Sequence, residues 1–333
     1  MATIYEVSKL AGVSLATVSR VMNKNARVSE KSRKKVQDAM DQLGYRPNSI
    51  AQSLASNRTN SIGILVSELH GPFFGQMMSG IESKLRSAGK HVIITTGHSE
   101  QEKEIDGIEF LLSRNCDALI LHVEAVSDEY LIELSKKSTP VYIMSRYVDS
   151  LKERCISLNN ELGGYLATKT LIEKGHSAIG FIGGPEFKAD SRSRLQGHRR
   201  ALKEFNISFD DKLYFEGDFK ETGGKEGIKS FLTNKSHFTA LVCGNDEMAS
   251  GAMTYAREHG ISLPEDLSII GFDNIIFSRH IYPKLTTIDN PIYQMGHMAA
   301  KIVLKHVYQQ DNIEVQHSFE PTVIVRDSVK NIS

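Results

Sequence analysis

The fold of the first part of the chain is decided by residues 3–20, TIYEVSKLAGVSLATVSR. Thr3 and Glu6 have the spacing of a capping box, in which each side chain satisfies a backbone donor at the start of a helix. Gly12 permits a tight turn, and Ser14 can cap a second helix that runs to about Met22. The pattern therefore predicts two short helices around a turn, a helix-turn-helix.

A third helix is expected after this pair. Ser29 can cap it, Val36, Met40 and Leu43 recur at helical spacing, and Gly44 can end it. Three short helices around a few apolar side chains form a small all-α head, which we assign to residues 1–46.

Charge separates this head from the rest of the chain. Residues 1–58 contain ten Lys and Arg against four Asp and Glu, although the whole chain has 40 of each. Cations beside phosphates release condensed counterions, so a basic helix-turn-helix is typical of DNA binding. The basic run 31–35 alone could be an ordinary solvated helix face. Together with the turn motif it favours double-stranded DNA as a partner.

Other classes of protein are not expected. No apolar run approaches the ~18 residues of a membrane span, and no apolar segment follows a basic start, so we expect a cytoplasmic protein without a membrane partner. Cys116, Cys155 and Cys243 are far apart and are interpreted as packing residues. The chain has no phosphate-binding glycine loop and no closely spaced pair of metal ligands, which argues against an enzyme, a metal site or a cofactor.

Residues 47–60 connect the head to the remaining chain. Pro47 ends the preceding helix, and Asn48 can cap a new helix of only about two turns. A helix that short is marginal alone, so we expect it to form against DNA or a second copy of the chain. An ordinary linker is the alternative interpretation.

From Ser61 onward, apolar runs alternate with amphipathic segments. The expected strands are 62–66, 92–96, 118–122, 141–144, 179–182, 240–243 and 268–271, followed late in the chain by 316–319 and 322–325. The expected helices are 73–88, 100–114, 128–137, 162–174, 193–205, 222–232, 246–259 and 291–309. This alternation predicts an α/β body of two doubly wound parallel-sheet lobes. We assign 61–160 with about 291–320 to the first lobe, and 161–290 with about 321–330 to the second.

Ligands of such folds bind where parallel strands end at their carboxyl side, here in a cleft between the lobes. Polar side chains follow several expected strands or open the next helix: Ser67, Glu68, Ser145, Asp190, Arg194, Asn245 and Asp273. Carboxylate, amide and guanidinium groups pair with vicinal hydroxyls, and an aromatic ring packs on the C–H face of a sugar. The set predicts a sugar-binding cleft, although each residue singly could be a helix cap or an ion-pair member.

Several motifs then recur in a familiar order, namely 46–55 (RPNSIAQSLA), 72–74 (PFF), 194–197 (RLQG), 245–252 (NDEMASGA) and 269–274 (IIGFDN). With the head, they resemble the LacI/GalR family of bacterial transcription regulators from Met1 to about Ser328. Residues 154–158, 166–168 and 238–243 resemble the branch that contains the galactose and β-glucoside repressors. The fold expected from this resemblance is that of periplasmic binding proteins behind a DNA-binding head.

The resemblance also implies roles for individual residues. Base edges would meet Leu15, Ala16 and Arg20, and phosphates would meet Thr17, Ser19 and Asn23. In the hinge it implies contacts from Ile50, Ala51 and Leu54, next to the helix cap Asn48, with Leu54 inserted in the minor groove. Effector contacts would come from Phe74, Ser145, Arg194, Asn245 and Asp273, joined by Asp190 from the strand-end pattern. Ile292 stands where some members place an aromatic residue.

The function expected is that of a dimeric repressor of a carbohydrate-utilisation operon. A small sugar such as galactose or a β-glucoside would release it from a near-palindromic operator. The chain stops at Ser333 without the heptad tail that makes the lactose repressor a tetramer, which favours a homodimer. Control by a purine-like corepressor or a partner protein is an alternative, and a sugar-modifying enzyme with a DNA-binding head is a third.

Overall fold

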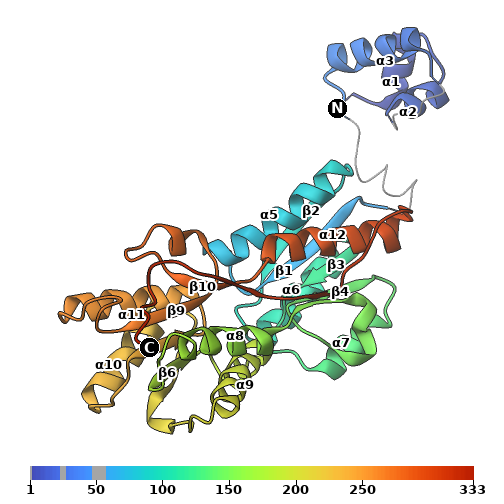
Figure 1. Cartoon of the computed structure of the whole chain (residues 1–333). Coiled ribbons are helices and arrows are strands. Elements are labelled where there is room, and N and C mark those ends of the chain that lie inside the picture. Colours follow the sequence, from blue (N-terminus) through green and yellow to red (C-terminus); the bar gives the residue numbers. More distant parts are fainter. Residues whose placement is uncertain (1, 23–27, 47–57) are drawn as a thin grey trace. The chain divides into compact units, whose positions relative to one another are not determined.

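The computed structural model describes residues 2–22, 28–46 and 58–333 (Figure 1). The chain divides into two compact units, a head within residues 1–60 and a body of residues 61–333.

The described residues of the head form α1 (Ile4–Ala11), α2 (Leu15–Met22) and α3 (Glu30–Leu43). The expected capping box is present, because Thr3 Oγ1 accepts the N–H of Glu6 at 3.4 Å and Glu6 Oε2 accepts the N–H of Thr3 at 2.7 Å. Gly12 turns the chain with a left-handed φ of 63°. Ser14 Oγ then accepts the N–H of Thr17 in α2 at 3.2 Å. Local capping chemistry therefore fixes the angle of the helix-turn-helix.

The interior of the head is small. Val7, Val18 and Val36, one from each helix, are fully buried against one another. Helical spacing alone predicts that Leu10 shares one apolar face of α1 with Val7 and Ala11, but Leu10 is 46% exposed. Val7 and Ala11 are one turn apart and already fill the narrow strip of α1 that meets the other helices, so Leu10 is left beside it.

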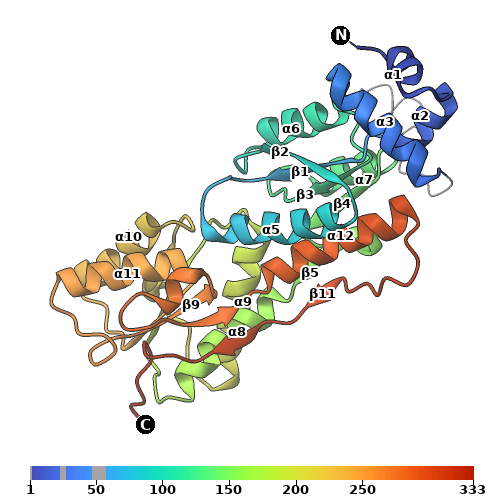
Figure 2. The same ribbon diagram turned by 90° about the horizontal axis from the view of Figure 1, so that it is seen from above.

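The first lobe is built on a sheet with the order β2-β1-β3-β4-β5-β11, in which every pair is parallel. Its strands are β1 (Ser61–Val66), β2 (His91–Thr96), β3 (Ala118–Leu121), β4 (Val141–Met144), β5 (Cys155–Leu158) and β11 (Ser318–Phe319). Helices α6 (Gln101–Ser113) and α7 (Asp128–Ser135) cover one face, and α5 (Pro72–Ser87) and α12 (Ile292–Tyr308) cover the other (Figure 2).

The second lobe repeats this plan in the order β7-β6-β8-β9-β10-β12. Its strands are β6 (Ile179–Gly183), β7 (Tyr214–Glu216), β8 (Ala240–Cys243), β9 (Ser268–Asp273), β10 (Thr286–Asp289) and β12 (Thr322–Ile324). Helices α8 (Asn160–Ile172) and α9 (Ala189–Glu204) pack on one face, and α10 (Glu221–Thr233) and α11 (Asp246–Glu258) pack on the other. The short 3-10 turns are η1 (Asp149–Arg154), η2 (Asp211–Leu213) and η3 (Ile276–Arg279).

The expected pair of doubly wound lobes is thus confirmed, with differences in detail. Three strands, β5, β7 and β10, have no counterpart among the expected strands. The last strand, β12, runs antiparallel to β10 rather than parallel. The chain passes between the lobes three times, after β5, after β10 and between β11 and β12.

Three helix pairs pack with their backbones in contact through glycines. A side chain added at any of six glycines would collide with a backbone carbonyl of the opposite helix. The pairs are Gly80 of α5 with Gly296 of α12, Gly164 of α8 with Gly197 of α9, and Gly224 of α10 with Gly251 of α11. This close approach sets the position of α9, whose first turns carry side chains into the space between the lobes.

Candidate functional site

The outer face of α2 carries the side chains predicted to read DNA. Leu15, Ala16, Ser19 and Arg20 are exposed, whereas Val18 faces the core of the head. Thr17 is half-buried, and its hydroxyl lies 3.0 Å from that of Ser14. The structure thus presents a short helix with one face of mixed polar and apolar side chains exposed to solvent. The other predicted DNA contacts lie outside the described residues: Asn23, Asn48, Ile50, Ala51 and Leu54.

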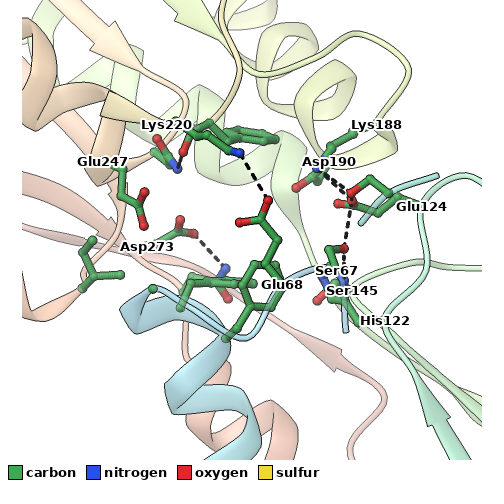
Figure 3. Close-up of a pocket in the computed structure, with 18 of the residues that line it drawn as sticks. Ser67, Glu68, His122, Glu124, Ser145, Lys188, Asp190, Lys220, Glu247 and Asp273 are labelled. Carbon is green, nitrogen blue, oxygen red and sulfur yellow. Dashed lines mark hydrogen bonds and ion pairs between the residues drawn. The ribbon is translucent and has the colours of Figure 1, made fainter. Parts of the chain in front are cut away.

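A cavity lies between the two lobes of the body, at the carboxyl ends of their strands (Figure 3). Its volume is about 960 Å³, counting the open mouth. All six residues predicted to contact an effector line it, namely Phe74, Ser145, Asp190, Arg194, Asn245 and Asp273. Segments remote in sequence are therefore brought to one place, as the strand-end argument requires.

Arg194 is the most firmly held of these side chains. Its Nη1 donates to the carbonyl oxygen of Gly244 at 2.6 Å, and its Nε donates to Asn160 Oδ1 at 2.9 Å. Its Nη2 lies 3.6 Å from Asp273 Oδ1, and the guanidinium stacks 3.7 Å from the centre of the Phe272 ring. Only 4% of Arg194 is exposed. The side chain is therefore preorganised before any ligand arrives.

Asp273 and Asn290 form the floor beside this arginine. Asn290, which follows β10, donates from Nδ2 to Asp273 Oδ1 at 3.0 Å. Burial raises the pKa of Asp273, and the charge of Arg194 and the Asn290 hydrogen bond offset part of that rise. The Oδ1 atom of Asn290 is buried and has no hydrogen-bond partner in the part of the chain that the structure describes. A buried amide oxygen of this kind is an acceptor for a ligand hydroxyl.

Asn245 is fully engaged by the protein. Its Oδ1 accepts the N–H of Met248 at 2.9 Å, which caps α11, and its Nδ2 donates to the carbonyl oxygen of Phe219 at 2.8 Å. This places the Phe219 loop in the cavity wall. Ile292 is buried in the core and does not line the cavity. The aromatic ring that the second lobe contributes to the cavity lining is that of Phe219.

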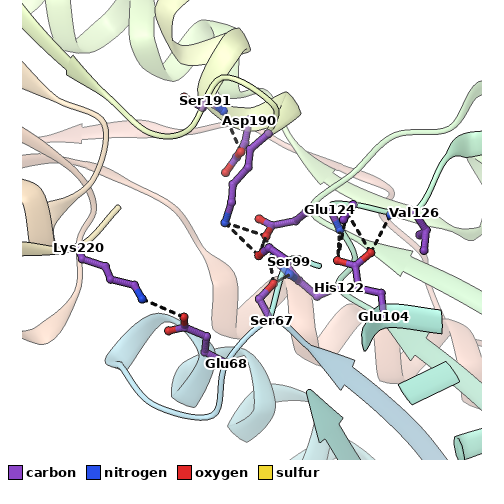
Figure 4. Close-up of polar contacts among 12 residues, drawn as sticks. Ser67, Glu68, Ser99, Glu104, His122, Glu124, Val126, Asp190, Ser191 and Lys220 are labelled. Atoms are coloured by element: carbon purple, nitrogen blue, oxygen red, sulfur yellow. Dashed lines mark hydrogen bonds and ion pairs between the residues drawn. The ribbon is translucent and has the colours of Figure 1, made fainter. Parts of the chain in front are cut away.

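An ion pair joins the lobes at one end of the cavity. Lys188 Nζ of the second lobe lies 2.8 Å from Glu124 Oε2 of the first (Figure 3), and both side chains are about 15% exposed. Ser67 and Ser99 also donate to Glu124 (Figure 4). Burial opposes ionisation, but the charges of His122 and Lys188 and these hydrogen bonds hold the pKa of Glu124 below its ordinary value.

The loop that carries Glu124 is itself anchored. The carboxylate of Glu104, fully buried in α6, accepts the backbone N–H groups of residues 124, 125 and 126 at 2.8–3.2 Å. A second interlobe pair joins Lys220 Nζ to Glu68 Oε1 at 3.3 Å. The two pairs bridge the cavity at separate places (Figure 3).

Glu247 points into the cavity from the start of α11 (Figure 3). Among the described residues, its carboxylate has no hydrogen-bond or ion-pair partner. Burial and the negative charge of Asp273 raise its pKa. Such a carboxyl group can pair with ligand hydroxyls.

None of the helices in the described part of the chain combines the length and hydrophobicity that a membrane crossing requires. Within the same residues, no three His, Cys, Asp or Glu side chains converge as metal ligands.

Comparison with known proteins gives the family. The family model described as bacterial regulatory proteins, lacI family, matches residues 3–48, and that of a periplasmic binding protein-like domain matches residues 168–329. The HTH-type transcriptional regulator GalR of Salmonella typhimurium strain LT2 is 39% identical over 329 residues, covering 99% of this chain and 96% of the relative. The chain belongs to the LacI family of bacterial regulators.

Two other proteins are similar to this LacI-family member over almost its whole length. The HTH-type transcriptional repressor PurR of Aliivibrio salmonicida is 37% identical over 333 residues, covering 100% of both chains. The crystal structure of the lac repressor dimer bound to operator and the anti-inducer ONPF superposes with a TM-score of 0.87 and 28% identity over 99% of each chain. The LacI-family protein described here is a DNA-binding transcriptional repressor under small-molecule control.

Proposed function

We propose that the protein represses a carbohydrate-utilisation operon and is released from its operator by a small sugar bound in the interlobe cavity. The observation that carries the proposal is the cluster of Arg194, Asp273 and Asn290. A fixed guanidinium, a carboxylate and an unsatisfied amide oxygen converge there. The rings of Phe74 from the first lobe and Phe219 from the second also line the cavity and supply apolar faces for a pyranose. Galactose or a β-glucoside fits this chemistry.

Sugar binding would act through the relation between the lobes. The cavity is lined from both lobes, so a ligand that fills it favours one lobe arrangement over another. It can shift that equilibrium only by the difference between its affinities for the two arrangements. The hinge segment 47–60 would transmit the shift, because a helix of about two turns forms only when a partner supports it.

On the DNA side, Leu15, Ala16 and Arg20 would contact base edges, while Thr17 and Ser19 would contact phosphates. A near-palindromic operator requires two heads, so we propose a homodimer acting on chromosomal DNA in the cytoplasm. Its interface would include the α5 and α12 faces. Sedimentation should show dimers, and a stable tetramer at micromolar protein would contradict this assembly.

A corepressor is the second candidate. The PurR relative at 37% identity favours it, and so do the phenylalanines of the cavity, because aromatic rings also stack on purine bases. The two candidates differ in sign, since an inducer weakens operator binding and a corepressor strengthens it.

Catalysis is the third candidate, and the hydrogen bonds of the cavity disfavour it. Ser67 Oγ lies 3.3 Å from His122 Nδ1 and donates its proton to Glu124 Oε2 at 3.1 Å. With its single proton directed at Glu124, Ser67 accepts from the imidazole. His122 is therefore not placed as a general base for this hydroxyl. We propose that bound sugar is not transformed.

The test is isothermal titration of the full-length protein against hexoses, β-glucosides and purines, with and without operator DNA. We expect one sugar to bind and to bind more weakly when operator is present. A purine that binds and strengthens operator affinity would establish the corepressor instead. Chromatography of the sugar after incubation checks the catalytic alternative, because it should recover the sugar unchanged.

A further inference from the structure

We propose that the effector is an amino sugar, a hexose whose protonated amino group pairs with the carboxylate of Glu247 in the interlobe cavity. The inference rests on the proposed function, because it specifies which class of sugar the same cavity selects. Two features of the lining point to it, the balance of charge and the hydrogen-bonding groups that the protein leaves unused.

The charged side chains of the cavity are mostly acidic. Among the described residues, the lining has six carboxylates, namely Glu68, Glu124, Asp190, Asp218, Glu247 and Asp273. The basic side chains of the same lining are Lys188, Arg194, Lys220, His70 and His122. Even with both histidines charged, the acids would exceed the cations by one. A neutral ligand that displaces water leaves this excess uncompensated, whereas a ligand with one positive charge offsets it.

The lysines and the arginine of the lining are already engaged by other acids. The ion pairs are Lys188 with Glu124, Lys220 and His70 with Glu68, and Arg194 with Asp190 and Asp273. Asp218 instead accepts hydrogen bonds within its own loop, from the backbone N–H groups of residues 220 and 223 and from the hydroxyl of Thr222. Of the six carboxylates, Glu247 alone has no partner in the described part of the chain.

The surroundings of Glu247 favour a cation from the ligand. The carboxylates of Glu68, Glu247 and Asp273 face the same space (Figure 3). Burial raises the pKa of Glu247, the negative charges of Asp273 and Glu68 add to the rise, and His70 and Lys220 oppose it. An ammonium group against Glu247 would reverse this rise, because a nearby positive charge favours the ionised carboxylate.

The unused hydrogen-bonding groups beside Glu247 are acceptors. Asn290 is 6% exposed and directs its amide N–H to Asp273, which leaves its buried Oδ1 without a partner among the described residues. Most donors of this region are already used, since Asn245 Nδ2 and the Nε and Nη1 atoms of Arg194 donate within the protein. An ammonium group supplies three donors and no acceptor. It therefore suits this lining better than a hydroxyl in the same place.

The experiment is calorimetric titration of the full-length protein with galactosamine and glucosamine, with their parent hexoses, and with their N-acetyl derivatives. At about pH 6.5 an amine of ordinary basicity carries its charge. We expect one hexosamine to bind at least about tenfold more tightly than its parent hexose, because its amine forms a hydrogen bond between charged groups. N-acetylation removes the charge and should abolish this preference, a comparison that needs no variant.

Glu247→Gln tests the assigned partner, because it keeps the size of the side chain and removes its charge. In this variant the ratio of hexosamine affinity to hexose affinity should fall below about twofold. Glu258→Gln is the matched control, since Glu258 is exposed on the same helix and does not line the cavity, and it should keep the wild-type ratio. Thermal unfolding shows that each variant is folded.

The outcomes separate the two proposals. If a hexose binds and its hexosamine binds no more tightly, the amino-sugar assignment is overturned while sugar control stands. The same holds if the N-acetyl derivative binds as tightly as the free amine, or if Glu247→Gln keeps the wild-type ratio. If no saccharide binds but a purine does, both proposals are overturned.

Discussion

At the scale of single residues, Arg194 shows how the cavity combines rigidity with recognition. Its bonds to Gly244 and Asn160 are satisfied within the protein, while its remaining N–H groups face Asp190 and Asp273 across 3.6–3.7 Å. Those gaps are too long for hydrogen bonds. A ligand hydroxyl beside such a pair can bridge it, accepting from the guanidinium and donating to a carboxylate with hydrogen bonds of ordinary length.

Replacing Arg194 by alanine should therefore abolish the response to effector. Loss of a charged hydrogen-bonding partner in a buried site costs about 1.5–3 kcal/mol, so sugar affinity should fall by about tenfold to more than a hundredfold. Operator affinity without effector should stay near wild type. Titration calorimetry and a fluorescence binding assay measure the two affinities. Gln196→Ala, an exposed change on the same helix, is the control. Unchanged sugar affinity in Arg194→Ala would refute the site.

The DNA-reading face makes a separate prediction. Arg20→Ala should cost about 1–3 kcal/mol at the cognate half-site and flatten base preference there, because a guanidinium can span two acceptors of guanine. Leu10→Ala is the control, since Leu10 is also exposed but lies on α1, outside the recognition helix. Wild-type affinity and preference in the Arg20 variant, at the same salt concentration, would show that α2 docks differently.

The sequence predicted only part of this site. Asn245 and Asp273 were predicted because each follows a strongly apolar strand. Asn290 and Phe219 were missed because they follow β10 and β7, which are four and three residues long and lack a long apolar run. Lys188 and Glu124 belong to different lobes. A pair so far apart in sequence leaves no periodic signal, so only the fold reveals it.

At the scale of elements, the glycines between paired helices explain why the lobes need small residues at fixed places. A methyl group at Gly80 would collide with the backbone carbonyl of Tyr293, and backbone cannot rotate away as a side chain can. Gly75 lies in the same helix with open space around its Cβ position. The two positions therefore form a natural pair for experiment.

We predict that Gly80→Ala lowers the free energy of unfolding by about 1–3 kcal/mol, because overpacking separates α5 from α12. Gly75→Ala should instead raise it by up to about 1 kcal/mol, because alanine loses less backbone freedom in a helix than glycine. Urea unfolding followed by circular dichroism compares them. Equal effects of the two substitutions would show that the close helix contact is not under strain.

Local chemistry explains which elements were predicted well. The helix starts at Thr3 and Ser29 were found because their side chains bond to backbone N–H groups three residues on, within reach of any sequence reading. The sequence predicted that α9 begins at Ser193, four residues after its observed start at Ala189. The first turn of α9 is polar, so apolar residues do not recur there at helical spacing. That turn bears Asp190, and its polarity serves the cavity rather than the core.

At the scale of the whole molecule, the Lys188–Glu124 pair ties the lobes together without a ligand. Because the pKa of Glu124 is lowered in the folded protein, ionised Glu124 contributes to the free energy of unfolding. This contribution is fully present above the ordinary pKa of 4.5 and is lost as pH falls through the lowered pKa. Glu124→Gln should destabilise the body at neutral pH by more than the ~0–1 kcal/mol of an exposed pair. The difference from wild type should shrink as the pH falls below 4.5.

Thermal unfolding across pH measures this difference. The control is Glu133→Gln, which removes an exposed pair with Lys136 and should change little at any pH. The double variant Glu124→Gln, Lys188→Met should recover part of the loss, since it leaves no buried cation without a partner. A pH-independent difference would mean that Glu124 acts by its shape and not by its charge.

A ligand in the cleft controls repression only if its binding is coupled to operator binding by the head. If the sugar weakens operator binding by some factor, operator must weaken sugar binding by the same factor, because both measure one coupling free energy. Typical couplings of about 5- to 150-fold lie within the range of titration calorimetry and fluorescence anisotropy. Two measurements on the full-length protein suffice, sugar affinity with operator or with scrambled DNA, and operator affinity with or without sugar. Matching factors above one are the signature of an inducer. A factor of one in both would mean that the ligand occupies the cleft without distinguishing the lobe arrangements, and the cleft would then not control repression.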